Sequence, residues 1–471
     1  MSTSPFEGLR ICLLTDQDIA SGLPLPADDW PCDPRPYLPE ARWDVLTLEQ
    51  EDAVPRLMDA AREGYDVFFN LCDGAWDEAR PGIEVVFALE RLGVAFTGAH
   101  SGCYEPSREA MKRVCHALGL HAPAGIEIRS DQDIEWAAAH LRYPLIVKHP
   151  SSYASAGLIP ASRVESAEDL WTQVARMRGL YHGALVEEFI DGDEYTVLVA
   201  ENPDDPDDPV AYQPLVYRFP EGEIFKHEDL KWVDYDGLEA GPVPDPALDA
   251  RLRTESSLFF RGLRASGYGR CDIRVDHEGT PWHLEINPNC GMFYPPTDPS
   301  SADLILKWDP AGHEGFVRTV VQAALARRAR SRRPWRVGRR VREQFKTVAA
   351  RSIQAGEVIL AVTEEPQELV EPSRITAVED AAARLRLLSR AWPLTEKVWA
   401  LGPSDPMAWH PLTHSCEPNA RIEGGALRAR SPLREGEAIT VDYGVVFGGA
   451  VPDLPCVCGA ARCRGRIVVD D

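Results

Sequence analysis

Asp272, Glu285 and Asn287 are a potential cation-binding set, with two carboxylates and one amide oxygen. Two short runs of alternating apolar residues, 271–275 and 281–286, flank a Gly-containing turn, which is typical of a β-hairpin. Antiparallel pairing of these runs brings the three oxygen side chains to one end of the sheet. Mg²⁺ binds through one or two carboxylates and takes further oxygens from water and phosphates. The simpler alternative is a surface hairpin with ordinary polar residues.

A lysine and a loop of small residues lie upstream of this hairpin. Residues 143–148 are predicted to form a buried strand that ends in Lys148, and the loop 151–157 follows with Ser152 and Ser155. Such a loop can close over a triphosphate, because its backbone N–H groups and hydroxyls are hydrogen-bond donors. Each signal is weak alone, since a lone strand lysine usually extends its charge into solvent.

The order of these pieces resembles that of the ATP-grasp enzymes. The segment 184–194 resembles the hinge of that family, which implies that Glu187, Glu188 and Ile190 contact adenine and that Glu194 holds the ribose. The resemblance also assigns roles to the other polar residues, with Lys148, Ser152, Ser155 and Lys231 on ATP, Arg270 and Lys231 as catalytic cations, and Asp272, Glu285 and Asn287 on Mg²⁺.

Three further segments, 69–74, 82–84 and 96–98, resemble the N-terminal domain of the D-alanine–D-alanine ligase branch, and the whole resemblance spans about residues 8–325. Family members carry lysines on the helix that starts near residue 107, one of which meets the ATP phosphates. Here the two positions are Arg108 and Lys112, and the sequence leaves open which of them contacts ATP.

The resemblance implies a ligase that phosphorylates a carboxylate and joins it to an amine. The turn 16–22 does not match the turn that holds the first amino acid in the D-alanine ligases. We therefore expect another amino acid or a peptide as the carboxylate substrate, with an amine as the acceptor. Ligases of this branch are often dimers, so a homodimer is a further expectation.

The composition limits the classes of partner. A net charge of −24 disfavours non-specific nucleic-acid binding and anionic membrane surfaces. Neither a signal peptide nor a transmembrane run is evident, so we expect a cytoplasmic protein. The odd number of cysteines, 11, argues against a disulfide framework.

The C-terminal part differs in character. Segments 410–419, 436–444 and 456–463 resemble, in this order, a SET-domain methyltransferase with its post-SET cysteines, over about residues 340–467. The resemblance implies S-adenosylmethionine as a cofactor. It places His414 and Asn419 in the cofactor pocket and makes Tyr443 the catalytic residue.

Cys456, Cys458 and Cys463 offer three thiolates, and a tetrahedral structural zinc needs a fourth ligand. Cys416 is the natural candidate, because SET domains of this type use a cysteine from the His-Ser-Cys segment. The alternative is four free thiols.

Two departures from the SET pattern concern cofactor binding. Segment 345–353 lacks the expected Gly-x-Gly turn, and Thr413 stands where an asparagine is usual. Three functions therefore stay open: a ligase that also N-methylates its substrate, a ligase whose SET-like domain only binds a peptide or protein, and a protein lysine methyltransferase regulated by an ATP-grasp module.

The expected fold is an α/β ATP-grasp protein, with a parallel-sheet N-terminal domain and two α+β ATP-clamping subdomains, followed by a mostly β SET domain. Chain length and the motifs predict four segments: an N-terminal domain 1–105, an ATP-grasp domain 106–326, a basic linker 327–339 and a SET and post-SET domain 340–471.

Overall fold

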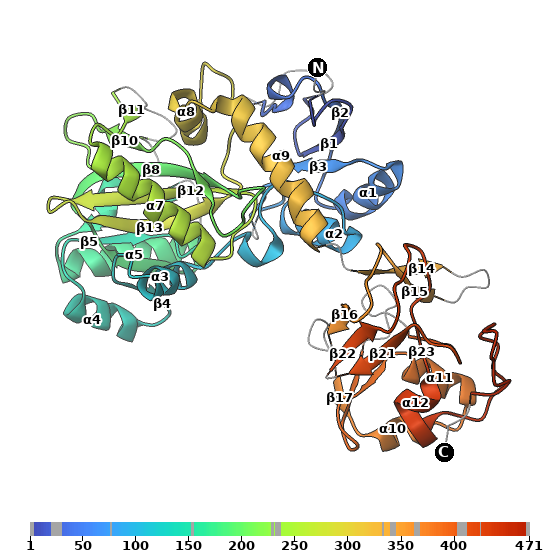
Figure 1. Ribbon diagram of the computed structural model, residues 1–471. Helices are drawn as coiled ribbons and strands as arrows, with labels where there is room; N and C mark the ends of the chain where they lie inside the picture. Colours follow the sequence, from blue (N-terminus) through green and yellow to red (C-terminus); the bar gives the residue numbers. More distant parts are fainter. Residues whose placement is uncertain are drawn as a thin grey trace. The chain divides into compact units, whose positions relative to one another are not determined.

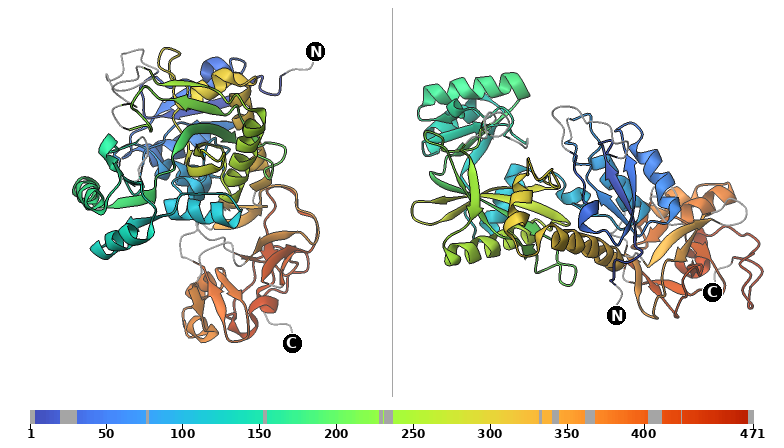
Figure 2. Two further views of the ribbon diagram at one scale, coloured as in Figure 1. Left: turned by 90° about the vertical axis from the view of Figure 1, so that its left-hand side faces the viewer. Right: turned by 90° about the horizontal axis from the view of Figure 1, so that it is seen from above.

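The computed structural model divides into two compact units, Met1–Ala329 and Arg330–Asp471 (Figures 1 and 2). It describes residues 4–19, 31–75, 78–151, 155–227, 230, 237–331, 334–339, 345–361, 368–402, 412–423 and 425–467. Among these residues, no helix combines the length and the hydrophobicity that a membrane crossing requires.

A parallel sheet of three strands opens the first unit, in the order β2 (Arg42–Thr47), β1 (Arg10–Thr15), β3 (Val67–Asn70). Both faces of β1 are buried, because alternate residues belong to two separate cores. One core contains helix α9 (Gly312–Ser331), and the other contains α1 (Ala53–Ala60) and α2 (Ile83–Leu92). The predicted parallel layer is present, and a parallel bridge between Phe68 and Phe96 extends it beyond β3.

A four-stranded antiparallel sheet forms the first clamping subdomain. Its order is β4 (Gly125–Ile128), β7 (Ala184–Glu188), β5 (Leu145–Lys148), β6 (Arg163–Val164). Helices α4 (Asp131–His140) and α5 (Ala167–Tyr181) pack on it through a common apolar core. Ser130 and Ser166 precede these helices and cap their N-termini, which fixes where each helix begins.

The second clamping subdomain is built on a larger antiparallel sheet. Its central order is β11 (Glu239–Pro242), β10 (Leu215–Arg218), β8 (Gly192–Ala200), β12 (Tyr268–Asp276), β13 (Pro281–Pro288), with β9 (Val210–Ala211) paired to β8. Helices α3 (Arg108–Ala117) and α7 (Pro246–Gly262) share its core. Only residues 189–191 separate β7 from β8, so the two sheets are joined by a short hinge (Figure 1).

The second unit is mostly β, with short paired strands around one apolar core. A parallel pair, β20 (Thr413–His414) and β23 (Thr440–Val441), brings two of the predicted SET motifs side by side. The other elements are β14 (Trp335–Arg339), β15 (Phe345–Ala349), β16 (Val358–Ala361), β17 (Glu368–Val370), α10 (Pro372–Thr376), α11 (Ala381–Leu388), β18 (Ala391–Pro393), β19 (Trp399–Leu401), β21 (Ala420–Glu423), β22 (Ala426–Ala429) and α12 (Tyr443–Phe447).

The segment interpreted as a linker, 327–339, is largely regular structure, because α9 continues to Ser331 and β14 spans Trp335–Arg339. Arg327 is not a free linker cation. Its guanidinium pairs with buried Glu201 and donates to the carbonyls of Phe96 and Gly98. The first charge of the basic run therefore stabilises the first unit.

Candidate nucleotide and metal sites

Strands β12 and β13 bring the predicted cation ligands together. Asp272 is the register partner of Glu285, and Arg270 is the partner of Asn287, with a bulge directly after Asp272. The Asn287 amide donates to Asp272 Oδ2 at 2.9 Å and to Glu285 Oε1 at 3.2 Å. Both carboxylates are mostly buried, so they form a compact oxygen cluster at the end of the hairpin.

Each of these carboxylates is paired with an arginine. Arg270 binds Asp272 with two hydrogen bonds, Nε to Oδ1 at 3.0 Å and Nη2 to Oδ2 at 2.9 Å. Arg108, which begins helix α3, forms an ion pair with Glu285. Burial lowers the pKa of Arg270, but its contact with Asp272 outweighs burial and raises that pKa above the usual range. The donor set fits the expected ligands, because carboxylates suit a hard cation and guanidinium groups suit phosphates.

Glu187 joins three elements in the first clamping subdomain. It lies on β7 with 1% of its surface exposed, and its carboxylate contacts Lys148 Nζ from β5 and Lys112 Nζ from α3, the latter at 2.5 Å. Burial would raise the pKa of Glu187, but the two lysines lower it to about 2. Burial lowers the pKa of Lys148 to about 8, against the opposing effect of Glu187. The structure therefore places Lys112 at Glu187 and Arg108 at Glu285.

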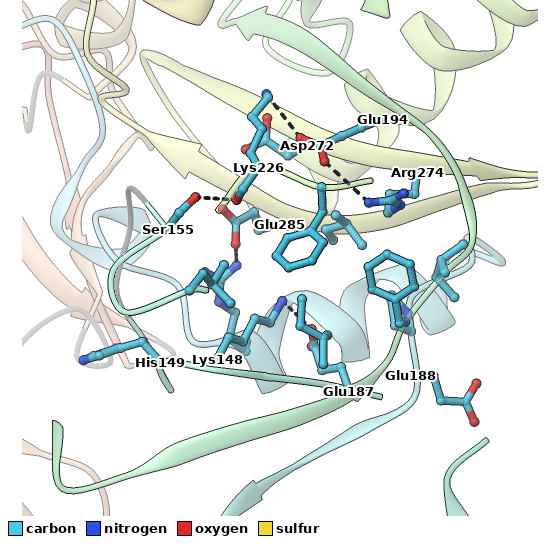
Figure 3. Close-up of a pocket in the computed structure, with 18 of the residues that line it drawn as sticks. Lys148, His149, Ser155, Glu187, Glu188, Glu194, Lys226, Asp272, Arg274 and Glu285 are labelled. Atoms are coloured by element: carbon cyan, nitrogen blue, oxygen red, sulfur yellow. Dashed lines mark hydrogen bonds and ion pairs between the residues drawn. The ribbon is translucent and has the colours of Figure 1, made fainter. Parts of the chain in front are cut away.

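Glu188 faces the other side of the same strand, as successive strand residues must. Arg142 donates to its Oε2 from Nε at 3.0 Å and from Nη2 at 2.7 Å, and the Arg142 backbone N–H donates to Oε1. Figure 3 shows the Glu188 side chain turned away from the other labelled residues. The Glu188 carboxylate and the Glu188 backbone N–H therefore both have protein partners, Arg142 and the Ala124 carbonyl.

Glu194 lies at the start of β8, where two cations approach its carboxylate. Lys226 Nζ is 3.2 Å from Oε1, and Arg274 Nη1 is 3.6 Å from Oε2. Together with Ile190, Ser155 and the hinge aromatic Phe189, these residues line one cleft (Figure 3). The same cleft contains most of the residues assigned above to ATP and Mg²⁺, namely Arg108, Lys148, Glu187, Glu188, Arg270, Asp272 and Glu285.

Two predicted contacts, Ser152 and Lys231, lie outside the described residues. Three lining residues with ionisable side chains, His149, Lys226 and Arg274, were not predicted. Lys226 lies in a polar segment without periodicity, so its sequence context carried no signal. Arg274 could have been predicted, because it lies two residues after Asp272 on the same strand. Side chains two residues apart in a strand point to the same face of the sheet.

The low pKa of Lys148 predicts a pH dependence of nucleotide binding. Lys148 is largely protonated at pH 7 and largely neutral at pH 9, whereas Glu187 stays ionised throughout. Phosphates favour the charged lysine, so we expect ADP affinity to fall about tenfold from pH 7 to pH 9. Isothermal titration calorimetry at both pH values measures this change.

Lys148→Arg is the matched control, because arginine stays protonated over this range. We expect the pH dependence to be nearly absent in this variant. Identical pH profiles for wild type and variant contradict the assignment to Lys148.

The second unit gathers its own cluster, formed by His414, Cys416, Cys456 and Cys458, whose ligand atoms all lie within 4.8 Å of one another. Cys416 Sγ is 3.7 Å from Cys456 Sγ, and the Cys416 N–H donates to Cys458 Sγ. Cys463, predicted as one of the four ligands together with Cys416, Cys456 and Cys458, is exposed, and its thiol lies 3.9 Å from the Cys456 carbonyl.

The hydrogen bonds of His414 indicate its role in this cluster. Its Nδ1 accepts from the Tyr443 N–H at 3.1 Å, so a neutral ring carries its proton on Nε2. That nitrogen lies 3.5 Å from Cys416 Sγ, where it donates to the sulfur. A protonated Nε2 has no lone pair for a metal, so this arrangement makes His414 a hydrogen-bond donor to the Cys416 sulfur.

Asn419, assigned to the cofactor pocket, and Tyr443, assigned to catalysis and to S-adenosylmethionine, have backbone partners. The Asn419 amide accepts from the Thr440 N–H and donates to the Ala438 carbonyl, both at 2.8 Å. The Tyr443 hydroxyl donates to the Leu412 carbonyl, and burial raises the pKa of Tyr443. Asn419 therefore links its own segment to the start of β23 through two hydrogen bonds. Tyr443 is a neutral phenol at physiological pH.

Comparison with known proteins identifies the relatives of the first unit. Residues 122–302 match the family model of the D-ala D-ala ligase C-terminus. The chain is 27% identical to the D-alanine–D-alanine ligase of Cupriavidus necator over 267 residues, which cover 56% of this chain and 77% of that protein. It is 28% identical to the corresponding ligase of Cupriavidus metallidurans over 273 residues, covering 57% and 78%.

The solved structure of the D-alanine–D-alanine ligase from Coxiella burnetii is similar with a TM-score of 0.51 at 14% identity, covering 69% of this chain and 96% of that chain. The predicted ATP-grasp fold is thereby confirmed for the part of the chain that is similar to these ligases. The SET interpretation of residues 340–471 gains no support from these similarities and stays a prediction.

Proposed function

We propose that the first unit is an ATP- and Mg²⁺-dependent carboxylate–amine ligase. The observation that carries the proposal is the single cleft in which the carboxylates Asp272 and Glu285 lie with the cations Arg270, Arg108 and Lys148. The similarity to D-alanine–D-alanine ligases supports the same reaction class.

The chain's own residues have defined tasks in this reaction. Asp272, Glu285 and Asn287 would hold Mg²⁺, which when bound neutralises charge on phosphate oxygens. Lys148 and Arg270 bind and orient the phosphates. A substrate carboxylate oxygen attacks the γ-phosphorus and ADP leaves. The amine then attacks the acyl carbon, phosphate leaves, and the nitrogen loses a proton.

The substrate is proposed to be an amino acid or peptide other than D-alanine, joined to an amine. In this protein, the turn that follows β1 begins with Asp16. Asp16 pairs with Arg80, and Arg80 also pairs with Asp73. This charged arrangement follows the ends of β1 and β3, where ligands bind in parallel sheets.

A substrate screen tests the ligase proposal. Purified protein is incubated with ATP, Mg²⁺ and pairs of amino acids and dipeptides, and ADP release is measured together with product mass. We expect ADP formation that depends on one carboxylate substrate and a product lighter than the sum of its parts by one water. Absence of ADP binding and of substrate-dependent ADP release contradicts the proposal.

For the second unit, we propose a zinc-stabilised SET methyltransferase that uses S-adenosylmethionine. The parallel pairing of β20 with β23 favours it, because it sets His414 beside Tyr443 with ring centroids 5.4 Å apart. Cys416, Cys456, Cys458 and Cys463 are proposed as zinc ligands, with His414 bonded to Cys416. The competing proposals are a domain that only recognises a peptide or protein and a lysine methyltransferase regulated by the ATP-grasp unit.

Zinc content and cofactor binding separate these proposals. We expect one zinc per chain and micromolar binding of S-adenosylmethionine in the wild type. Both are lost in Cys458→Ser, because three thiolates leave the metal site incomplete. Tyr443→Phe should keep the zinc and lose methyl transfer. Zinc without any cofactor binding favours the recognition domain, and methylation of a protein lysine without ligase activity favours the regulated methyltransferase.

A further inference from the structure

Lys226 is a buried cation in the cleft that the sequence did not single out. It lies between β10 and β11, and its side chain is 15% exposed. Figure 3 shows its Nζ reaching toward Glu194, beside Asp272, on the opposite wall of the cleft from Lys148. Lys226 therefore lies between the residue assigned to the ribose and the residues assigned to the metal.

The charge of Lys226 is not needed to neutralise its neighbours. Glu194 is already paired with Arg274, which is 4% exposed, and Asp272 accepts hydrogen bonds from two nitrogens of Arg270, Nε and Nη2. Among the described residues, Lys226 also makes a cation–π contact with Tyr217, with Nζ 3.0 Å from the ring centroid. Burial opposes the charged form, but Tyr217 and Glu194 outweigh it and raise the pKa of Lys226, so the side chain is charged.

The backbone around Lys226 is fixed from both clamping subdomains. Ser155, from the small-residue loop of the first, donates its hydroxyl to the Lys226 carbonyl at 3.1 Å. Arg274, from the second, donates to the Ile224 carbonyl at 2.9 Å. The Phe225 ring meets the hinge residue Phe189 edge to face at 5.9 Å. The backbone that carries the Lys226 side chain is thus held in place without a ligand.

We propose that Lys226 is a phosphate-binding residue of this cleft, which lets the protein favour nucleoside di- and triphosphates over the nucleoside itself. The proposal rests on the nucleotide-dependent function proposed above. A lysine ammonium is a point charge on a flexible stem with three donors, so Lys226 can move from Glu194 to a phosphate oxygen while Arg274 keeps Glu194 neutralised.

Calorimetry with ADP, AMP and adenosine, each in the presence of Mg²⁺, tests the proposal. In Lys226→Met we expect ADP to bind about 10- to 100-fold more weakly, because a hydrogen bond between charged groups is lost. Adenosine affinity should change by less than about threefold, since it has no phosphate. Lys226→Arg should retain most of the ADP affinity. Lys307→Met, an exposed lysine on α8 (Ser301–Trp308), is the matched control and should bind like the wild type.

The outcomes separate this proposal from the one on which it rests. Wild-type protein that binds no adenine nucleotide overturns the proposed ligase function and the role of Lys226 with it. If the wild type binds ADP and Lys226→Met binds it with the same affinity, the role of Lys226 is overturned and the ligase proposal stands. Equal losses for ADP and adenosine also overturn it, because Lys226 would then only support Glu194. If Lys226→Met does not fold, Lys226→Arg provides the test. A folded Lys226→Arg protein that no longer binds ADP contradicts a role that depends only on the positive charge.

Discussion

Glu187→Gln is expected to destabilise the first unit by about 3–5 kcal/mol at pH 7, because it leaves buried Lys148 and Lys112 without their shared carboxylate. All three side chains are at most 14% exposed, so water cannot replace the lost partner. The free energy of unfolding in denaturant measures this change.

The neighbouring residue provides the control. Glu188→Gln removes a carboxylate from the same strand, but its partner Arg142 is 76% exposed. Exposed pairs contribute little, so we expect a loss within about 1 kcal/mol. Equal losses in the two variants would show that Glu187 is not the electrostatic centre of the cluster. Lys148→Met in the Glu187→Gln background should recover part of the stability, since it removes one of the two unpaired charges.

Asp272→Asn is expected to lower ATP turnover by about 10³-fold, because loss of one metal ligand removes several kcal/mol of charge stabilisation in the transition state. The same change should weaken the Mg²⁺ dependence of ADP binding, which calorimetry measures even before the carboxylate substrate is known. Thermal unfolding of the variant verifies that the hairpin survives the loss of the pair with Arg270.

Glu278→Gln is the control on the same hairpin, since Glu278 is exposed in the turn between β12 and β13. It should keep the wild-type turnover and Mg²⁺ dependence. If Asp272→Asn keeps a turnover within tenfold of the wild type and an unchanged Mg²⁺ dependence, the assignment of Asp272 as a metal ligand is contradicted.

The metal hairpin was predictable because its signal is local. Alternation over 271–275 and the short turn predict the hairpin and place Asp272, Glu285 and Asn287 near one end of it. The pairing of Asp272 with Glu285 depends on the bulge directly after Asp272, which the sequence pattern did not predict. The alternation of side chains along a strand also places Glu187 and Glu188 on opposite faces of β7. A strand that directs Glu187 to Lys148 must direct Glu188 to the opposite face, where Arg142 lies.

Long-range contacts were not predictable from local patterns. The pairing of Arg108 with Glu285 joins residues far apart in the chain, and only the packing of α3 on the large sheet creates it. Lys226 stands in a polar segment that resembles a solvated turn, and its burial depends on Ser155, Tyr217 and Glu194. In the second unit, the proximity of His414 to Tyr443 follows from the pairing of β20 with β23.

The arginine pairs of the metal hairpin have a consequence for the order in which ligands arrive. In the structure, Arg270 and Arg108 occupy the oxygens of Asp272 and Glu285. A bare divalent cation that enters must displace a guanidinium and leave like charges in contact in a buried cleft, which is costly. A cation that arrives already bound to a nucleotide brings phosphates with it, and these give each displaced arginine a new partner. We therefore expect free Mg²⁺ to bind only weakly to this site, and the metal and the nucleotide to bind together as one complex.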